Sequence, residues 1–199
     1  MKMYSNKKMK TIIIATASIL LSACASVSQN DLVNLTPSST LSAKQIVSGK
    51  TFTLTSQDIR TAQYIAEIKM DGQEQVQPLH AKQNVRQAYT SAIYQQFYSQ
   101  GFAKTKNSNN TLNIKIVDAV AKVDQKSMKF AISGKVVIQI TAETPNGKFV
   151  KSYQGTGNKT GSFTASIADV EEVINRVSGN VLANIAKDSE LTNYMKGNF

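Results

Sequence analysis

Residues 129–140 read KFAISGKVVIQI, and this stretch sets the expected fold class. Apolar side chains alternate with polar or small ones along it, which is the period of a β-strand that buries one face. The turn signal Pro145-Asn146-Gly147 follows, in which proline presets φ for the first corner and glycine is free to take a positive φ. We therefore expect a β-hairpin whose returning strand covers residues 148–154.

Further strands are expected on both sides of this hairpin. Alternation of Leu, Ile and Val over 112–123 predicts the strand before it, and a change of phase at Val117 indicates a bulge or a strong bend. A first strand is expected over 51–55, before an irregular stretch that ends at the turn Asp71-Gly72. The glycine-rich segment 155–161 is expected to be a mobile connection after the returning strand. It does not fit a phosphate-binding loop, because that pattern requires glycine directly before the lysine.

Two long helices are expected, each with one apolar stripe. The first begins after Asn84, a favourable N-cap, and ends at Gly101, a favourable C-cap residue. The second covers residues 166–186, where apolar side chains recur every three or four residues. Asp169 stands three residues after Ser166, as in a capping box. A short helix is expected at 189–196.

The order β-α-β-β-β-α predicts an α+β fold with a single domain over residues 49–199. Both helix stripes must be buried, and a two-layer sandwich achieves this with two long helices on one face of a mostly antiparallel sheet of about four strands. With 41% hydrophobic residues among 199, the chain has room for one such domain and little else.

The amino terminus predicts export and lipidation. A basic start over residues 1–10 precedes an apolar run over 12–21, which is the layout of a signal peptide (residues 1–23) and is too short for a membrane-spanning helix. The sequence Leu21-Ser22-Ala23-Cys24 resembles the lipobox of bacterial lipoproteins, in which the first three residues serve signal-peptidase recognition and the thiol receives a diacylglyceryl group. By this resemblance Cys24 carries a covalent lipid. The alternative is an ordinary signal peptide with a chance cysteine.

The residues after Cys24 bear on where the protein is held. Two or three acyl chains make a durable anchor, since each buried methylene contributes about 0.8 kcal/mol. In lipoproteins an aspartate directly after the cysteine commonly retains the protein in the inner membrane, whereas Ala25-Ser26-Val27 stands here. By resemblance to that rule, we expect the protein in the bacterial outer membrane, facing the periplasm. Residues 24–48 are expected to form the lipidated cysteine and a flexible tether.

Short motifs in the second half of the chain point to a family. They are AKVDQ at 121–125, NGK at 146–148, GSF at 161–163, ADV at 168–170 and DSEL at 188–191. Arg60-Thr61 and Gly101-Phe102 extend the pattern into the first half. In the order and spacing of these motifs the chain resembles the YajG-type family of uncharacterised bacterial lipoproteins. The resemblance implies a lipoprotein without an assigned activity.

Composition argues against most catalytic and metal chemistry. The chain has one Cys, one His and no Trp, so no disulfide can form within it and no His/Cys metal cluster can be assembled. His80 has no identifiable partner that would orient it as a general base. Asp169, Glu171 and Glu172 fit the first turns of a helix better than a paired-carboxylate site. We therefore expect no catalytic residue, no metal ligand, no cofactor apart from the lipid on Cys24, and no enzymatic activity.

Charge restricts the partners. The net charge of +10 falls to +6 once the four lysines of the signal peptide are removed. A basic surface favours anionic partners in general, but an exported protein does not meet nucleic acid, and no basic-aromatic stacking motif is present. Asp58 and Arg60 stand two residues apart and are expected to form a local ion pair; the alternative is that they bind a ligand group.

One face of the predicted sheet has no covering layer. If Ile138 and the other alternating apolar residues face the helices, Lys115, Lys135 and Gln139 lie on the opposite face, which is then small, polar and basic. This surface is the candidate docking site for an envelope protein or an anionic polymer. The alternatives are a carrier or sensor of a small or lipidic ligand held between sheet and helices, and a cell-wall hydrolase with two carboxylates in a cleft.

Overall fold

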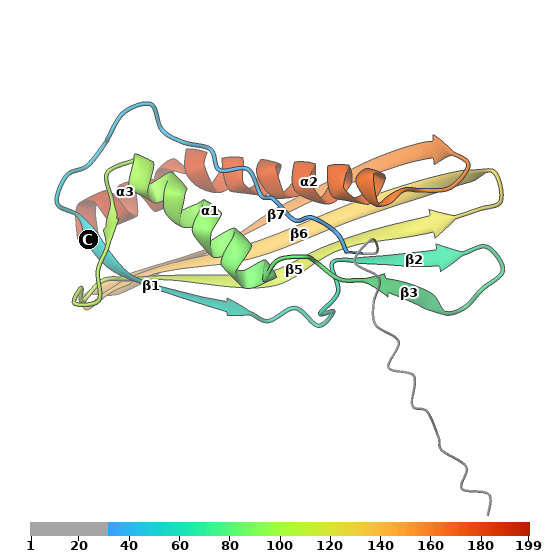
Figure 1. Ribbon diagram of the computed structural model, residues 1–199. Coiled ribbons are helices and arrows are strands. Elements are labelled where there is room, and N and C mark those ends of the chain that lie inside the picture. Colours follow the sequence, from blue (N-terminus) through green and yellow to red (C-terminus); the bar gives the residue numbers. More distant parts are fainter. Residues whose placement is uncertain (1–31) are drawn as a thin grey trace, which may run out of the picture.

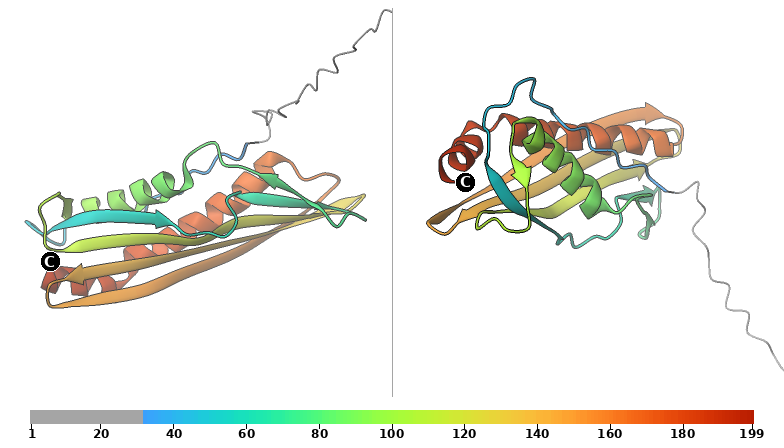
Figure 2. Two further views of the ribbon diagram at one scale, coloured as in Figure 1. Left: turned by 90° about the horizontal axis from the view of Figure 1, so that it is seen from below. Right: turned by 60° about the vertical axis from the view of Figure 1, so that its left-hand side comes forward.

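The computed structural model describes residues 32–199, so the expected signal peptide, the lipobox and Cys24 lie outside the described residues. The described chain forms two layers, a long twisted sheet and the helices that cover one of its faces (Figures 1 and 2). In chain order the elements are β1 (Thr51–Asp58), β2 (Ala66–Met70), β3 (Val76–Leu79), α1 (Val85–Ser99), β4 (Ala103–Lys104), β5 (Thr111–Gln125), β6 (Lys129–Thr144), β7 (Gly147–Ser162), α2 (Ile167–Lys187) and α3 (Ser189–Asn198).

The sheet is mixed. Strand β5 pairs antiparallel with β6, and β6 pairs antiparallel with β7, as the hairpin signals predict. Along its other side, β5 pairs with two strands that lie end to end, β1 beside residues 111–116 and β2 beside residues 121–125, and both run parallel to it. The α+β class with helices on one face is confirmed. The expected sheet of about four mostly antiparallel strands is wrong, because the sheet has seven strands and β1, β2 and β4 pair in parallel.

Two of the three strands that sequence reasoning missed, β2 and β3, lie in the irregular stretch around Asp71, and the third, β4, follows α1. Strand β2 has five residues and β3 has four, so neither is long enough to show a clear period. Pro78 lies within β3, where it is tolerated because β3 is an edge strand that pairs only with β2. Parallel pairing of β1 with β5 requires a crossover connection, and the chain between them contains α1.

A bulge in β5 separates the part that pairs with β1 from the part that pairs with β2. The register shifts just after Ile116, as the change of phase at Val117 predicts. The chain between β1 and β2 passes this point, and the guanidinium of Arg60 lies in the gap. It donates hydrogen bonds to the backbone oxygens of Tyr64 and Ala119 at 3.0 and 3.3 Å.

Asp58 holds the same guanidinium from the other side. Its carboxylate accepts two hydrogen bonds of 2.9 Å from Nε and Nη2 of Arg60, whose side chain is 3% exposed. Partial burial by itself raises the pKa of Asp58, but the hydrogen bonds and the charge of Arg60 outweigh it, so this pKa lies below its ordinary value. The expected local ion pair is confirmed, and its role is to join the end of β1 and the connection before β2 to β5.

The predicted helices are confirmed together with their caps. The Asn84 side chain accepts a hydrogen bond of 3.0 Å from the backbone N–H of Gln87 at the start of α1. A capping box between Ser166 and Asp169 begins α2. Helix α1 packs over β1 and β5, whereas α2 packs over β6 and β7 (Figure 1). The buried core lies between these helices and the sheet.

The glycine-rich segment 155–161 is strand, and the expectation of a mobile connection is wrong. Strand β7 continues to Ser162, which pairs with Lys129 of β6. Three glycines of the hairpin, Gly134, Gly155 and Gly157, lie directly beneath α2. A Cβ atom at any of them would stand only 2.7–2.8 Å from a valine methyl group of that helix. Glycine is needed here because the two layers approach closely.

The chain from Leu32 to Ser48 belongs to the folded domain. Val33 pairs with Ala81 as an isolated bridge, and both Val33 and Leu35 are fully buried. The backbone N–H of Asn34 donates to Glu171 Oε1 of α2 at 2.6 Å. The prediction of a flexible tether over 24–48 therefore does not hold for residues 32–48, and the domain begins before Gly49.

Candidate functional site: the open face of the sheet

The face of the sheet that points away from the helices is polar. Figure 2 shows that no helix or strand of the described chain lies over it. Its side chains come from alternate positions of β1, β5, β6 and β7, and most of them are Thr, Ser, Asn, Gln or charged residues. We call this surface the open face.

Strand register arranges the open face in rows that cross four strands. The first row consists of Gln57, Lys115, Gln139 and Ser152, and the second consists of Thr55, Asn113, Thr141 and Val150. A shallow groove follows these rows and is also lined by Thr111, Glu143 and Lys148. The groove therefore offers hydroxyl, amide and charged groups at the spacing of neighbouring strands, about 4.8 Å.

Asn113 lines this groove, and only one of its two polar side-chain atoms forms a hydrogen bond. Its Nδ2 donates to Thr55 Oγ1 at 2.7 Å. Its Oδ1 is buried and accepts no hydrogen bond from the described residues. A buried acceptor without a donor is unfavourable, so this oxygen lowers the stability of the sheet at this point.

The predicted docking residues Lys115, Lys135 and Gln139 all lie on the open face. Lys135 Nζ lies 3.2 Å from Asp118 Oδ2, so its charge is largely compensated. Among the described residues, no carboxylate lies within ion-pair distance of Lys115, and Gln139 donates only a long hydrogen bond of 3.4 Å to Ser152. The face is polar as expected and less basic than expected.

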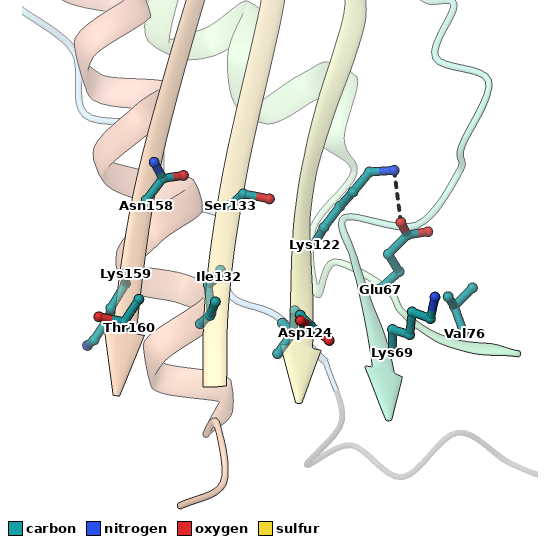
Figure 3. Close-up of a pocket in the computed structure, with 12 residues that line it drawn as sticks. Glu67, Lys69, Val76, Lys122, Asp124, Ile132, Ser133, Asn158, Lys159 and Thr160 are labelled. Atoms are coloured by element: carbon teal, nitrogen blue, oxygen red, sulfur yellow. Dashed lines mark ion pairs between the residues drawn. The ribbon is translucent and has the colours of Figure 1, made fainter. Parts of the chain in front are cut away.

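A second hollow lies on the same face near the ends of β2, β5, β6 and β7 (Figure 3). Glu67 projects into it and forms an ion pair of 3.0 Å with Lys122. The Tyr64 hydroxyl donates to the other carboxylate oxygen at 2.5 Å. The hydrogen bond from Tyr64 and the charge of Lys122 hold the pKa of Glu67 below its ordinary value. This carboxylate is therefore ionised and engaged within the fold.

The dense acidic group of Asp169, Glu171 and Glu172 holds the start of α2 in place. Asp169 Oδ1 lies 2.7 Å from Lys159 Nζ of β7, and Glu172 pairs with the same lysine and with Arg176. Glu171 accepts the hydrogen bond from the N-terminal segment described above. The hydrogen bond with Lys159 is the main cause that lowers the pKa of Asp169 to about 2. Each carboxylate has a structural partner, in agreement with the interpretation from sequence.

His80 is exposed between β3 and α1. It borders a polar cleft with Gln63, Asn84 and Arg86, and its side chain has no hydrogen-bond partner among the described residues. Within residues 32–199, no group of three or more His, Cys, Asp or Glu side chains is arranged to hold a metal ion.

Sequence reasoning missed the role of Gln125, a buried side chain at the end of β5. Its Nε2 donates to the backbone oxygen of Phe163 at 2.8 Å, and its Oε1 accepts the N–H of Ala165 at 2.9 Å. These bonds tie the end of β5 to the connection between β7 and α2. Gln125 closes the AKVDQ motif, but the motif alone does not show which backbone groups it binds.

Comparison with known proteins places the chain in a family. Residues 37–196 match the family described as "Uncharacterized lipoprotein", and the chain belongs to this family. It is 27% identical over 151 residues to the "Uncharacterized lipoprotein YajG" of Escherichia coli strain K12, with 75% of this chain and 78% of that protein covered. The match to the protein of the same name from Escherichia coli O6:H1 has the same values. The resemblance expected from the sequence motifs is confirmed, and it assigns no molecular activity.

A solved structure has a distant likeness. The crystal structure of protein XCC0632 from Xanthomonas campestris matches with a TM-score of 0.45 and 15% identity, covering 80% of this chain and 95% of that one. This likeness is too low to support an argument about function. None of the described helices combines the length and the hydropathy that a membrane crossing requires. A lipoprotein family implies attachment to a membrane by a lipid anchor.

Proposed function

We propose that the protein is a non-enzymatic lipoprotein of the bacterial outer membrane, anchored by lipid on Cys24. Its domain faces the periplasm and binds an envelope protein or an anionic polymer through the open face. The family and the lipobox support the anchor, and the Ala25-Ser26-Val27 sequence supports the outer membrane. The observation that carries the binding role is the uncovered groove, which Lys115 lines without forming an ion pair among the described residues.

The groups in the groove indicate what kind of partner it fits. Lys115 supplies a positive charge that no described carboxylate pairs with, and Gln139 and Thr141 line the groove with polar groups. A partner with both anionic and hydroxyl or amide groups can pair with Lys115 and form hydrogen bonds with these polar side chains. Attraction to Lys115 is expected to weaken as salt increases, because the groove is open to solvent.

The carrier alternative receives no support from the packing between the layers. A ligand held between sheet and helices requires a cavity there. At Gly134, Gly155 and Gly157 the helix α2 approaches so closely that a single added carbon atom would meet a valine at 2.7–2.8 Å. A hydrolase requires two free acids that converge in a cleft, whereas Asp169 and Glu172 are both engaged by Lys159.

The test is capture of a partner from cross-linked cell envelopes with the full-length, lipidated protein. Lys115→Glu should reduce capture strongly, and Asn113→Leu should reduce it as well. Lys82→Glu is the matched control, because Lys82 is exposed, forms no ion pair among the described residues and lies before α1. Lys135 is left unchanged, because replacing it by an acidic residue would break its ion pair and place a second acid beside Asp118.

The two lysine variants must also have equal unfolding midpoints, which separates binding from folding. Equal capture by Lys115→Glu, Lys82→Glu and the unmodified protein would contradict the role of the open face.

A further inference from the structure

The sheet has one end at which exposed apolar side chains gather. Strands β2, β5, β6 and β7 all begin or end there, because Met70 pairs with Gln125 and Lys129 pairs with Ser162. Met128 and Phe163 are 68% and 66% exposed, and Met70 and Val76 of the β2–β3 hairpin are 41% and 42% exposed. We call these four residues the apolar end. Figure 1 shows β2 and β5 ending at its right-hand side.

Phe163 is held at this end in an unfavourable backbone conformation. Its φ of 66° lies in the left-handed region, which glycine or asparagine would occupy with less strain. Its N–H donates to the backbone oxygen of Met128 at 2.9 Å, and its own oxygen accepts the bond from Gln125 at 2.8 Å. The fold therefore fixes an aromatic ring in solvent at a position where neither backbone geometry nor solubility favours one, which suggests a functional use.

The apolar end lies close to the place where the described chain begins. Asn34 contacts Glu171 in α2, and α2 begins at Ile167, four residues after Phe163. From the dimensions of extended and helical chain, Phe163 and Glu171 are at most about 20 Å apart. Cys24 precedes Asn34 by ten residues, which span at most about 35 Å. A lipid on Cys24 therefore tethers the domain at the side where α2 begins, which is the side of the apolar end and not the opposite end of the sheet.

Charges of both signs surround the apolar end, where exposed Glu74 of the β2–β3 hairpin joins Asp71 and Asp124 as the acidic groups. Lys69 and Lys129 are exposed and form no ion pair among the described residues. Lys126 pairs with Asp71 and Asp124 at 3.3 and 3.4 Å and so neutralises part of their charge. Aromatic and sulfur-containing side chains flanked by lysines are typical of segments that lie in a membrane interface.

We propose that the apolar end inserts into the lipid surface in which the protein is anchored, with Phe163 and Met128 among the lipid head groups and acyl chains. This inference rests on the lipid anchor at Cys24 proposed above. Lipid contact at the apolar end would orient the domain so that the sheet extends away from the membrane surface. The open face then remains accessible to partners in the periplasm. Lipid contact adds to the anchor instead of replacing it, because so few side chains bind membranes weakly by themselves.

The experiment uses the full-length, lipidated protein in vesicles of phosphatidylethanolamine and phosphatidylglycerol. Lipidation consumes the only native thiol, so Phe163→Cys and Met128→Cys each offer one site for an environment-sensitive fluorophore. Leu41→Cys is the matched control, since Leu41 is 61% exposed and lies beside the last turn of α1, where the N–H of Ser42 donates to Ser99. Circular dichroism of each labelled chain must match the unmodified protein.

We expect blue-shifted emission and several-fold weaker quenching by iodide at positions 163 and 128 than at position 41. Iodide quenching at position 163 equal to that at position 41, in protein that sediments with the vesicles, would overturn the lipid contact and leave the anchor intact. Failure of the unmodified protein to incorporate a labelled fatty acid and to sediment with vesicles would overturn both proposals. Photocross-linking from position 163 in intact envelopes to protein instead of lipid would also overturn the lipid contact.

Discussion

Gly155→Ala should destabilise the domain, although alanine is the better strand residue. The added Cβ would lie 2.7 Å from Val181 Cγ2 and 3.4 Å from both Cγ1 and the backbone oxygen of Val177. Carbon atoms prefer separations of about 3.5–4.0 Å, so strand or helix must move by nearly 1 Å. Overpacking of this kind costs about 1–3 kcal/mol. Replacing glycine by alanine within a strand by itself raises the free energy of unfolding by about 0.5–1 kcal/mol. We expect a net loss of about 0.5–2 kcal/mol.

The matched control is Gly147→Ala, at the start of the same strand. There the nearest atom to an added Cβ is the Tyr194 hydroxyl oxygen at 3.8 Å, an ordinary contact, and the residue has no positive φ. This variant should keep or slightly gain stability. Urea denaturation of a chain that begins at Leu32, followed by circular dichroism, measures both free energies of unfolding. If Gly155→Ala proves as stable as Gly147→Ala, close contact between α2 and β7 is not the reason for glycine at position 155.

Ile174→Asp should lower the free energy of unfolding by about 3–5 kcal/mol, because Ile174 is fully buried; an unchanged urea midpoint would contradict that burial. Cys24→Ala should abolish acylation, and incorporation of a labelled fatty acid by this variant would disprove the anchor assignment. Since Lys159 lowers the pKa of Asp169 to about 2 from 3.8, ionised Asp169 stabilises the fold above pH 4 and loses this effect as pH falls toward 2. Between these pH values the urea midpoint should therefore fall more for the unmodified protein than for Asp169→Asn. Phe163→Gly should raise the free energy of unfolding by up to about 1 kcal/mol through relief of strain; a loss of stability would show that the ring packs within the fold.

The long elements could be predicted because their signals are local. Strands β5 and β6 show a clear period of two, and the bulge after Ile116 is visible as a change of phase. The two long helices carry both an apolar stripe and a cap, at Asn84 and at Ser166. Each of these signals depends on residues within a few positions of one another, so no knowledge of distant contacts is needed.

The candidate site could be predicted in its position but not in its charge. Alternation alone places Lys115, Lys135 and Gln139 on one face. The ion pair of Lys135 with Asp118 depends on the register across the bulge, which brings Asp118 opposite Val137 and beside Lys135. The buried, unpaired oxygen of Asn113 likewise depends on the parallel neighbour β1, because Thr55 takes up only the amide donor.

By itself, the sequence determined the family motifs, the long strands and the capped helices, and it predicted export and lipidation. Only the tertiary structure decided that β1 and β2 lie end to end beside β5, that residues 32–48 pack into the domain, and that the segment 155–161 is strand. From the sequence of this segment alone, its glycine content predicts mobility. In the folded domain, the absence of side chains at these glycines lets α2 approach the sheet closely. Period and capping act between near neighbours in the chain, whereas parallel pairing and layer spacing arise between segments that meet only after the chain has folded.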